Sequence, residues 1–133
     1  MDIEQILANA ELVRKVAHEQ LGINVGYDEA GVRWLDESIN HQRSYATEAV
    51  KTQLPIALGS FLGECIRRTY GGEWYLSENG WGIKINEKLS AFPFNKVRKQ
   101  LTNEDGDSVL GLFTTIPAFL ALPPAINKPA TQK

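Results

Sequence analysis

Residues 58–74 read LGSFLGECIRRTYGGEW, and this stretch carries more information about the fold than any other part of the chain. Apolar side chains recur at spacings of three and four from Leu58 to Ile66, which predicts a buried helical face. Gly59 and Gly63 stand four residues apart beside that face. Because each glycine costs about 1 kcal/mol of helix propensity relative to alanine, we expect another segment to pack closely against them, the alternative being a helix crossing in a homodimer.

A β-hairpin is predicted after Gly71-Gly72, which end this helix. Asn79-Gly80 is typical of a two-residue hairpin turn, and it pairs Trp74 with Ile85 across the two strands. In the same register Tyr75 lies opposite Lys84. The predicted apolar face consists of Trp74, Leu76, Ile83 and Ile85. The predicted polar, solvent-facing side consists of Glu73, Tyr75, Ser77, Gly82, Lys84 and Asn86.

Two helices are predicted before residue 58. Residues 2–21 have an amphipathic pattern, in which Asp2 and Gln5 fit a capping box and Gly22 fits a left-handed stop. A second helix is expected to begin at Asp28 and to end or kink at Pro55. Its apolar stripe consists of Val32, Leu35, Ile39, Ala46, Ala49 and Gln53.

Further elements are predicted after the hairpin. A two-stranded hairpin is only marginally stable in water, so we expect a third strand at residues 89–92. Asn95 is predicted to cap a short basic helix, and Asp107 or Ser108 to open a last helix that Pro117 ends. Residues 109–126 carry no charge but contain three prolines. We therefore expect a buried helix followed by an apolar docking arm, not a membrane helix.

These elements indicate one α+β domain over residues 1–126, with three to four helices packed on a small antiparallel sheet built around the 73–86 hairpin. A chain of 133 residues is long enough to bury one hydrophobic core. Residues 127–133 are polar and contain Pro129, so we expect a flexible C-terminal tail there.

Composition and charge exclude several functions. The net charge is −2 and the pI is about 5.7, which argues against a general nucleic-acid binder. Cys65 is the single cysteine and can form no internal disulfide. The first residues are acidic and polar instead of a basic segment followed by an apolar run. We therefore expect a cytoplasmic protein that binds neither nucleic acid nor a membrane.

The sequence contains no pattern typical of a catalytic or metal site. Glu37 and His41 lie one helical turn apart, but no neighbouring pattern supplies the third and fourth ligands of a zinc site. Cys65 occupies an apolar helix position, where a thiol is desolvated. Residues 103–107 lack the ligand spacing of a calcium loop. We expect no metal and no cofactor, and a protein that is not an enzyme.

The best candidate for recognition is a charged group on the 58–70 helix. Glu64 reaches Arg67 and Arg68 at three and four residues, which is also the spacing of an ordinary surface ion pair. If the hairpin lies beside the arginines, the group can bind an acidic protein partner or a phosphate. The predicted partner-binding residues are Glu64, Arg67, Arg68, Tyr75 and Lys84.

The same stretch resembles a signature of small bacterial domains of unknown function. The shared pattern is LG-x-x-LGE-x-IRR-x-x-GG-x-W, followed by Phe92-Pro93-Phe94 and Lys96-Val97. The resemblance covers roughly residues 50–115. It implies a compact domain of helices and strands, and it implies no activity and no site residues.

Three functions follow from these observations as hypotheses. The absence of catalytic patterns favours a non-catalytic interaction module, for example a bacterial immunity protein that masks a toxin. One alternative is an enzyme or a small-ligand-binding protein whose pocket lies between the hairpin and the helices and uses Glu64, Arg67, Arg68 or Tyr75 as its polar groups. The other is a homo-oligomeric structural component that uses the apolar stretch 109–126 as its contact surface.

Overall fold

The computed structural model describes residues 1–43, 45, 47–102 and 108–121. Within these residues lie five helices and one three-stranded antiparallel sheet, so the predicted α+β class is confirmed, with one helix more than the upper number expected. The elements are α1 (Ile3–Leu21), α2 (Glu29–Arg43), α3 (Glu48–Tyr70), β1 (Glu73–Ser77), β2 (Gly80–Lys84), β3 (Ser90–Ala91), α4 (Pro93–Leu101) and α5 (Val109–Leu120). The predicted turn at 103–107, the arm at 122–126 and the tail at 127–133 lie outside the described residues.

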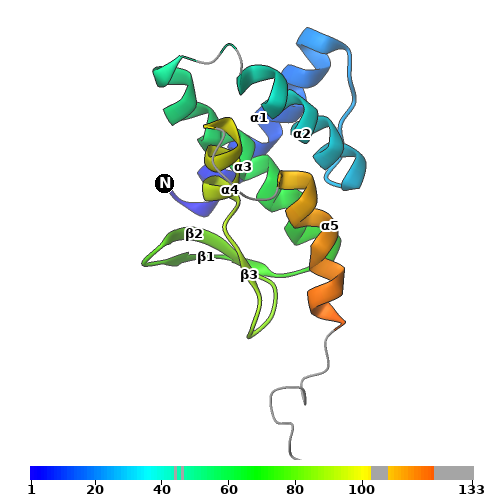
Figure 1. Ribbon diagram of the computed structural model, residues 1–133, viewed down its shortest axis with the longest axis vertical. Helices are drawn as coiled ribbons and strands as arrows, with labels where there is room; N and C mark the ends of the chain where they lie inside the picture. The colour runs from blue at the N-terminus through cyan, green and yellow to red at the C-terminus, as the bar shows by residue number, and fades with distance from the viewer. Residues whose placement is uncertain (44, 46, 103–107, 122–133) are drawn as a thin grey trace, which may run out of the picture.

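Helix α3 lies at the centre of the molecule, and the sheet lies on one side of the helices (Figure 1). Helix α3 packs against α1, α2, α4, α5 and β2. Its buried side includes the predicted apolar residues Leu58, Phe61, Leu62, Cys65 and Ile66. None of the described helices combines the length and the apolar character needed to cross a membrane.

Helix α1 has the predicted cap at each end. Asp2 accepts a hydrogen bond from the backbone N–H of Gln5 at 2.9 Å, and the Gln5 side chain accepts one from the backbone N–H of Asp2 at 2.8 Å. These bonds satisfy two amides that have no partner inside the helix. Gly22 follows α1 with φ 68°, and its N–H donates to the carbonyl of His18.

The prediction for the second helix was wrong about where it ends. Helix α2 stops at Arg43, and α3 begins at Glu48, well before Pro55. Thr47 explains the new start, because its hydroxyl accepts a hydrogen bond from the backbone N–H of Val50 at 3.2 Å. Pro55 lies inside α3 and is buried. The loss of one backbone hydrogen bond at Pro55 is outweighed by the burial of the turns that follow it.

Gly59 and Gly63 let two other segments reach the backbone of α3. A Cβ atom on Gly59 would overlap the ring of Phe94 on α4, and a Cβ atom on Gly63 would overlap the ring of Trp74 on β1. The predicted close packing is therefore confirmed, and it occurs within one chain.

The hairpin forms, but its register differs from the predicted one by two residues. Trp74 lies opposite Ile83, because Ser77 pairs with Gly80 across the turn. The Ser77 hydroxyl closes this turn: it donates to the carbonyl of Gly80 at 2.9 Å and accepts from the backbone N–H of Asn79 at 3.0 Å. Gly80 has φ 97° and is the left-handed residue after the turn, not its second central residue.

A shift of two residues leaves each side chain on its predicted face. Trp74 and Ile83 are buried, and Ala91 of the predicted third strand lies opposite Ile83. Leu76 lies on the same face near the turn, but its side chain is 65% exposed. The prediction of a fully buried apolar face was therefore wrong at Leu76, and the predicted pairing of Tyr75 with Lys84 was wrong as well.

Helices α4 and α5 correct two predicted boundaries. Helix α4 begins at Pro93, not at Asn95, because the missing N–H of a proline costs little at the first helical position. Ser108 opens α5 as predicted, and its hydroxyl accepts from the backbone N–H of Gly111 at 3.0 Å. Helix α5 continues past Pro117 to Leu120, since only about one turn follows the proline.

A buried polar side chain joins α2, α4 and α5. Gln100 donates from Nε2 to Asp36 and to Asn40, both at 3.1 Å. Its Oε1 accepts from the backbone N–H of Val109 at 2.8 Å. Arg43 donates to the backbone carbonyl of Gln100 at 2.9 Å. These bonds fix the start of α5 against α2 and satisfy the buried amide of Gln100.

Candidate functional site

Glu64 is a fully buried carboxylate on α3. Arg67 donates to its two oxygens from Nε and Nη2 at 2.7 and 2.8 Å, and Arg68 donates from Nε at 2.9 Å. The indole Nε1 of Trp74 donates a fourth hydrogen bond at 2.8 Å. The spacing in the sequence predicted both arginine partners. The pair is not an ordinary surface ion pair, because Glu64 has no exposure while the Arg67 and Arg68 side chains are 34% and 46% exposed.

The environment of Glu64 keeps it ionised. Burial by itself raises the pKa of a carboxyl group, because it disfavours the charged form. Hydrogen bonds from Arg67, Trp74 and Arg68 outweigh this effect and hold the pKa of Glu64 below its ordinary value. The hydrogen bond to Glu64 in turn raises the pKa of Arg67. A negative charge therefore lies beneath two positive charges at neutral pH.

Arg68 also contacts an aromatic ring from the segment between α1 and α2. Its guanidinium carbon lies 4.1 Å from the centre of the Tyr27 ring, and that of Arg14 lies 5.1 Å from the same centre. The Tyr27 hydroxyl donates to Glu11 at 2.5 Å, and Arg14 also donates to Glu11. Burial, and then the bond to Glu11, raises the pKa of Tyr27. A network of contacts thus connects α1 with α3.

Part of each guanidinium group on α3 is available for another molecule. Among the described residues, the structure assigns no hydrogen-bond acceptor to Nη1 of Arg67 or to either Nη atom of Arg68. A guanidinium group has five N–H donors in a planar fork. Arg67 and Arg68 can therefore donate to an anionic group while Glu64 holds them in place. This arrangement lowers the side-chain entropy that the arginines lose on binding.

Tyr75 and Lys84, the other predicted site residues, do not join this cluster. Consecutive residues of a strand point to opposite faces of the sheet. Because Trp74 points toward Glu64, Tyr75 points away from it. The Tyr75 ring lies 6.4 Å from the ring of Phe92, and Lys84 pairs with Glu73 across the strands. The structure thus brings together three of the five predicted residues.

Trp74 and Tyr27 are members of the cluster that the sequence reasoning missed. The alternation of the hairpin predicts Trp74 on an apolar face, although a buried indole N–H usually needs an acceptor. That requirement, together with the carboxylate on the preceding helix, was the available signal. Tyr27 reaches Arg68 only through the packing of α1 on α3, and no spacing rule connects residues so far apart in the sequence.

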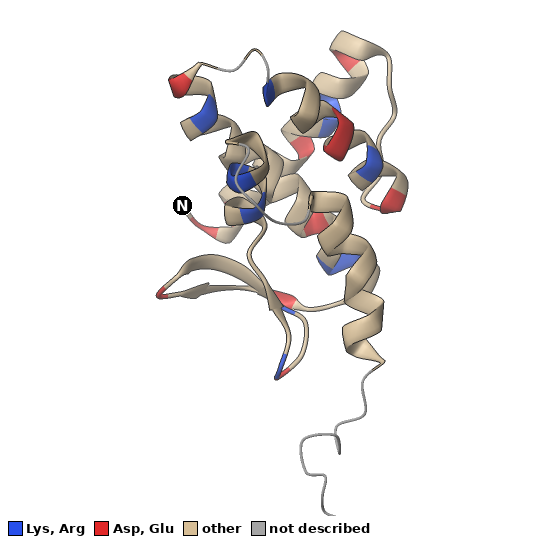
Figure 2. Cartoon of the chain, in the orientation of Figure 1, with Lys and Arg blue, Asp and Glu red and all other residues tan. Residues whose placement is uncertain are grey.

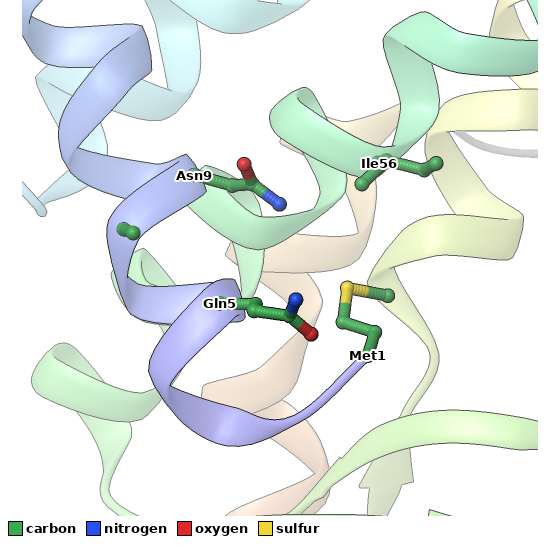
Figure 3. A pocket seen from close by; sticks show the side chains of 5 residues that line it. Met1, Gln5, Asn9 and Ile56 are labelled. Atoms are coloured by element: carbon green, nitrogen blue, oxygen red, sulfur yellow. The ribbon is translucent and has the colours of Figure 1, made fainter.

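Two adjoining open hollows lie elsewhere on the surface. The first, of about 270 Å³, lies between the hairpin turn, α3 and α4. The second, of about 380 Å³, lies between α1 and α3, where Gln5 and Asn9 project from α1 toward Ile56 (Figure 3). Met1 and Ile56 line both hollows. Glu64, Arg67, Arg68 and Tyr75 line neither of these two hollows.

The remaining candidate groups do not form a reactive centre. Cys65 is buried, and burial raises the pKa of its thiol. Within the described residues, no group of three His, Cys, Asp or Glu side chains is arranged to hold a metal ion. Figure 2 shows that acidic and basic residues are interspersed over α1, α2 and α3, whereas α4 carries only basic residues and α5 carries neither kind.

Comparison with known proteins assigns neither a family nor a function: no protein-family model, curated protein or solved structure matches the chain. The resemblance to small bacterial domains of unknown function therefore stays a prediction.

Proposed function

We propose that the protein is a non-catalytic, cytoplasmic interaction module that recognises an acidic protein partner through Arg67 and Arg68. A bacterial immunity protein that masks a toxin is one concrete form of this function. The observation that carries the proposal is the buried carboxylate of Glu64, which holds two adjacent arginines whose outer N–H groups stay available.

Three physical arguments support this proposal. An arginine that is already ordered loses less entropy on binding than a free one. The planar guanidinium group matches the geometry of a carboxylate and can donate two parallel hydrogen bonds to it. On a chain with a net charge of −2, a local group of positive charges attracts acidic partners selectively. Tyr75 and Lys84 are not part of the proposed surface.

Affinity capture from a lysate of the native host tests this function when wild-type bait is compared with the Arg68→Gln variant. Replacing both arginines by glutamate is uninformative, because it would leave the buried Glu64 without counter-charges and unfold the chain. Arg68→Gln instead leaves Arg67 and Trp74 bound to Glu64. The matched control is Arg33→Gln, because Arg33 also pairs with a glutamate on its own helix, at 2.8 Å, but on the exposed surface.

We expect wild-type and Arg33→Gln baits to retain one acidic protein in stoichiometric amount and to release it as the salt concentration rises. The Arg68→Gln bait should lose this protein while its far-UV circular dichroism stays that of the wild type. Undiminished capture by Arg68→Gln, or a captured protein without an acidic surface, would refute the proposed function.

The second candidate function is the binding of a small ligand, and the hollow of about 270 Å³ favours it. This hollow combines the rings of Trp81 and Phe94 with the amides of Asn79 and Asn95, a mixture typical of small-molecule sites. Native mass spectrometry of the gently purified protein separates the two functions. A retained small molecule that is lost in Trp81→Ala would favour this candidate, whereas a bare protein mass would favour the interaction module.

A further inference from the structure

A positively charged surface extends from α3 across Tyr27 to α1. We call it the basic strip, and it consists of Arg14, Lys15, Arg67 and Arg68. Arg14 and Arg68 contact the same Tyr27 ring, at 5.1 and 4.1 Å from its centre, so cations from two helices are joined by one side chain. Lys15 is exposed and lines the same hollow as Arg14. The strip is therefore continuous over α1 and α3.

Two carboxylates next to the basic strip already accept hydrogen bonds from its arginines and from Tyr27. Glu64 is buried under Arg67 and Arg68, and Glu11 accepts from Tyr27 and Arg14. The hydrogen bond from Tyr27 lowers the pKa of Glu11, although burial by itself would raise it. The hydrogen bond and the charge of Arg14 lower it further. Lys15 and the outer N–H groups of Arg67 and Arg68 remain for an external anion, although the whole chain carries a net negative charge. These donors allow the strip to attract an acidic partner.

The end of the basic strip on α1 is hollowed. A cavity of about 250 Å³ is lined by Glu11, Arg14, Lys15, His18, Asn24 and Val25. Arg14 donates from Nε to the carbonyl of Val25 at 2.7 Å, and the His18 and Asn24 side chains lie 2.8 Å apart as hydrogen-bond partners. These contacts hold the walls of the cavity. Lys15 forms no ion pair among the described residues, so its ammonium group can receive an external carboxylate.

Building on the proposed function, we propose that the partner binds along the whole basic strip through an acidic polypeptide segment. One carboxylate of the segment meets Arg67 and Arg68, and a second enters the cavity beside Lys15. A segment with two separated carboxylates fits better than a single phosphate ion, because the two cationic ends lie on different helices with the Tyr27 ring between them. Leu12 and Val16, exposed on α1 one turn apart and next to Glu11 and Lys15 in the sequence, add apolar contact area.

Titration of the isotope-labelled protein with an end-capped (Glu-Ala)₄ peptide, followed by NMR, tests this inference. We expect saturable shifts at residues 11–27 and 64–70, and no saturation with a (Gln-Ala)₄ peptide. The Lys15→Glu variant should bind (Glu-Ala)₄ roughly fivefold more weakly, because it reverses one charge of the strip. The Lys99→Glu variant is the control, since Lys99 is also exposed but lies on α4.

The possible outcomes distinguish binding along the whole basic strip from binding at Arg67 and Arg68 alone. Shifts confined to residues 64–70, with full affinity in Lys15→Glu, would overturn the strip and leave the proposed function of Arg67 and Arg68 standing. Displacement of the peptide by an equal concentration of inorganic phosphate would overturn the assignment to a polypeptide. If no peptide binding saturates at low salt, the inference is wrong, and the capture experiment with Arg68→Gln still decides the proposed function independently.

Discussion

The indole N–H of Trp74 donates to the Glu64 carboxylate at 2.8 Å, so the first strand of the hairpin completes the charged cluster on α3. Gly63 makes this contact possible, because a side chain there would overlap the Trp74 ring. Gly71 and Gly72 have φ values of 89° and 111°, which let the chain leave α3 and return toward it. Residues 59–74 thus form one structural unit, which contains the glycines, the carboxylate, the two arginines and the tryptophan.

The first prediction concerns the free energy of unfolding of Glu64→Gln. The variant loses the negative charge and replaces one acceptor oxygen with an NH₂ group that faces the N–H donors of the arginines and Trp74, and we expect a loss of about 2 kcal/mol. This value is below that of a fully buried pair because both arginines are partly exposed. Urea denaturation at pH 7 measures it. Glu29→Gln, which breaks the exposed pair with Arg33, should cost less than about 0.5 kcal/mol, and equal losses in the two variants would be inconsistent with a buried anchor.

The second prediction concerns the pH dependence of the same difference. Glu64 has a pKa held below the ordinary value of 4.5, so its contribution to stability is fully present above pH 4.5. It is lost as the pH falls through the lower, folded-state pKa. The difference in unfolding free energy between wild type and Glu64→Gln should therefore be constant from pH 7 to pH 5 and shrink at more acidic pH. If the difference in unfolding free energy grew on acidification, the result would contradict a lowered pKa of Glu64 in the folded protein.

Close packing at Gly63 gives the third prediction. In Gly63→Ala the added methyl group must push the Trp74 ring away from α3, which we expect to cost about 1–3 kcal/mol despite the better helix propensity of alanine. Thermal denaturation measures the loss, and Gln20→Ala on the exposed side of α1 is the control. An unchanged or raised melting temperature for Gly63→Ala would mean that the ring does not rest on the glycine.

The fourth prediction concerns the buried amide of Gln100. The variant Gln100→Ala leaves the backbone N–H of Val109 without its acceptor, and we expect a loss of about 1–3 kcal/mol. Hydrogen exchange should show the Val109 amide losing its protection before the amides of α3 do. Gln42→Ala, at an exposed position of α2, should change neither quantity. Full protection of Val109 in Gln100→Ala would indicate that another group holds the start of α5.

Local chemistry predicted much of this fold. Asp2, Gln5 and Gly22 specify both ends of α1 because capping depends only on neighbouring residues. The spacing of Glu64, Arg67 and Arg68 predicted their ion pairs for the same reason. Side-chain burial, however, depends on elements far away in the sequence, and it converted an expected surface pair into a buried anchor.

Where the predictions failed, a weaker local signal or a distant contact prevailed. Pro55 indicated a helix boundary, but the cap at Thr47 and the burial of α3 decided otherwise. Asn79-Gly80 indicated the turn, yet the Ser77 hydroxyl moved the register by two residues. The contact of Tyr27 with Arg68 requires α1 to lie on α3, which no pattern within either segment encodes.

The central claim is that Glu64 holds Arg67 and Arg68 in fixed positions at the surface, and NMR of the arginine side-chain Nε–H groups tests it most directly. In the wild type, the Nε–H groups of Arg67 and Arg68 should exchange with water more slowly than that of Arg33, whose glutamate partner is exposed. In Glu64→Gln this difference should disappear. If Arg67 and Arg68 exchange as fast as Arg33 in the wild type, the arginines are not held in place and the proposed recognition surface loses its physical basis.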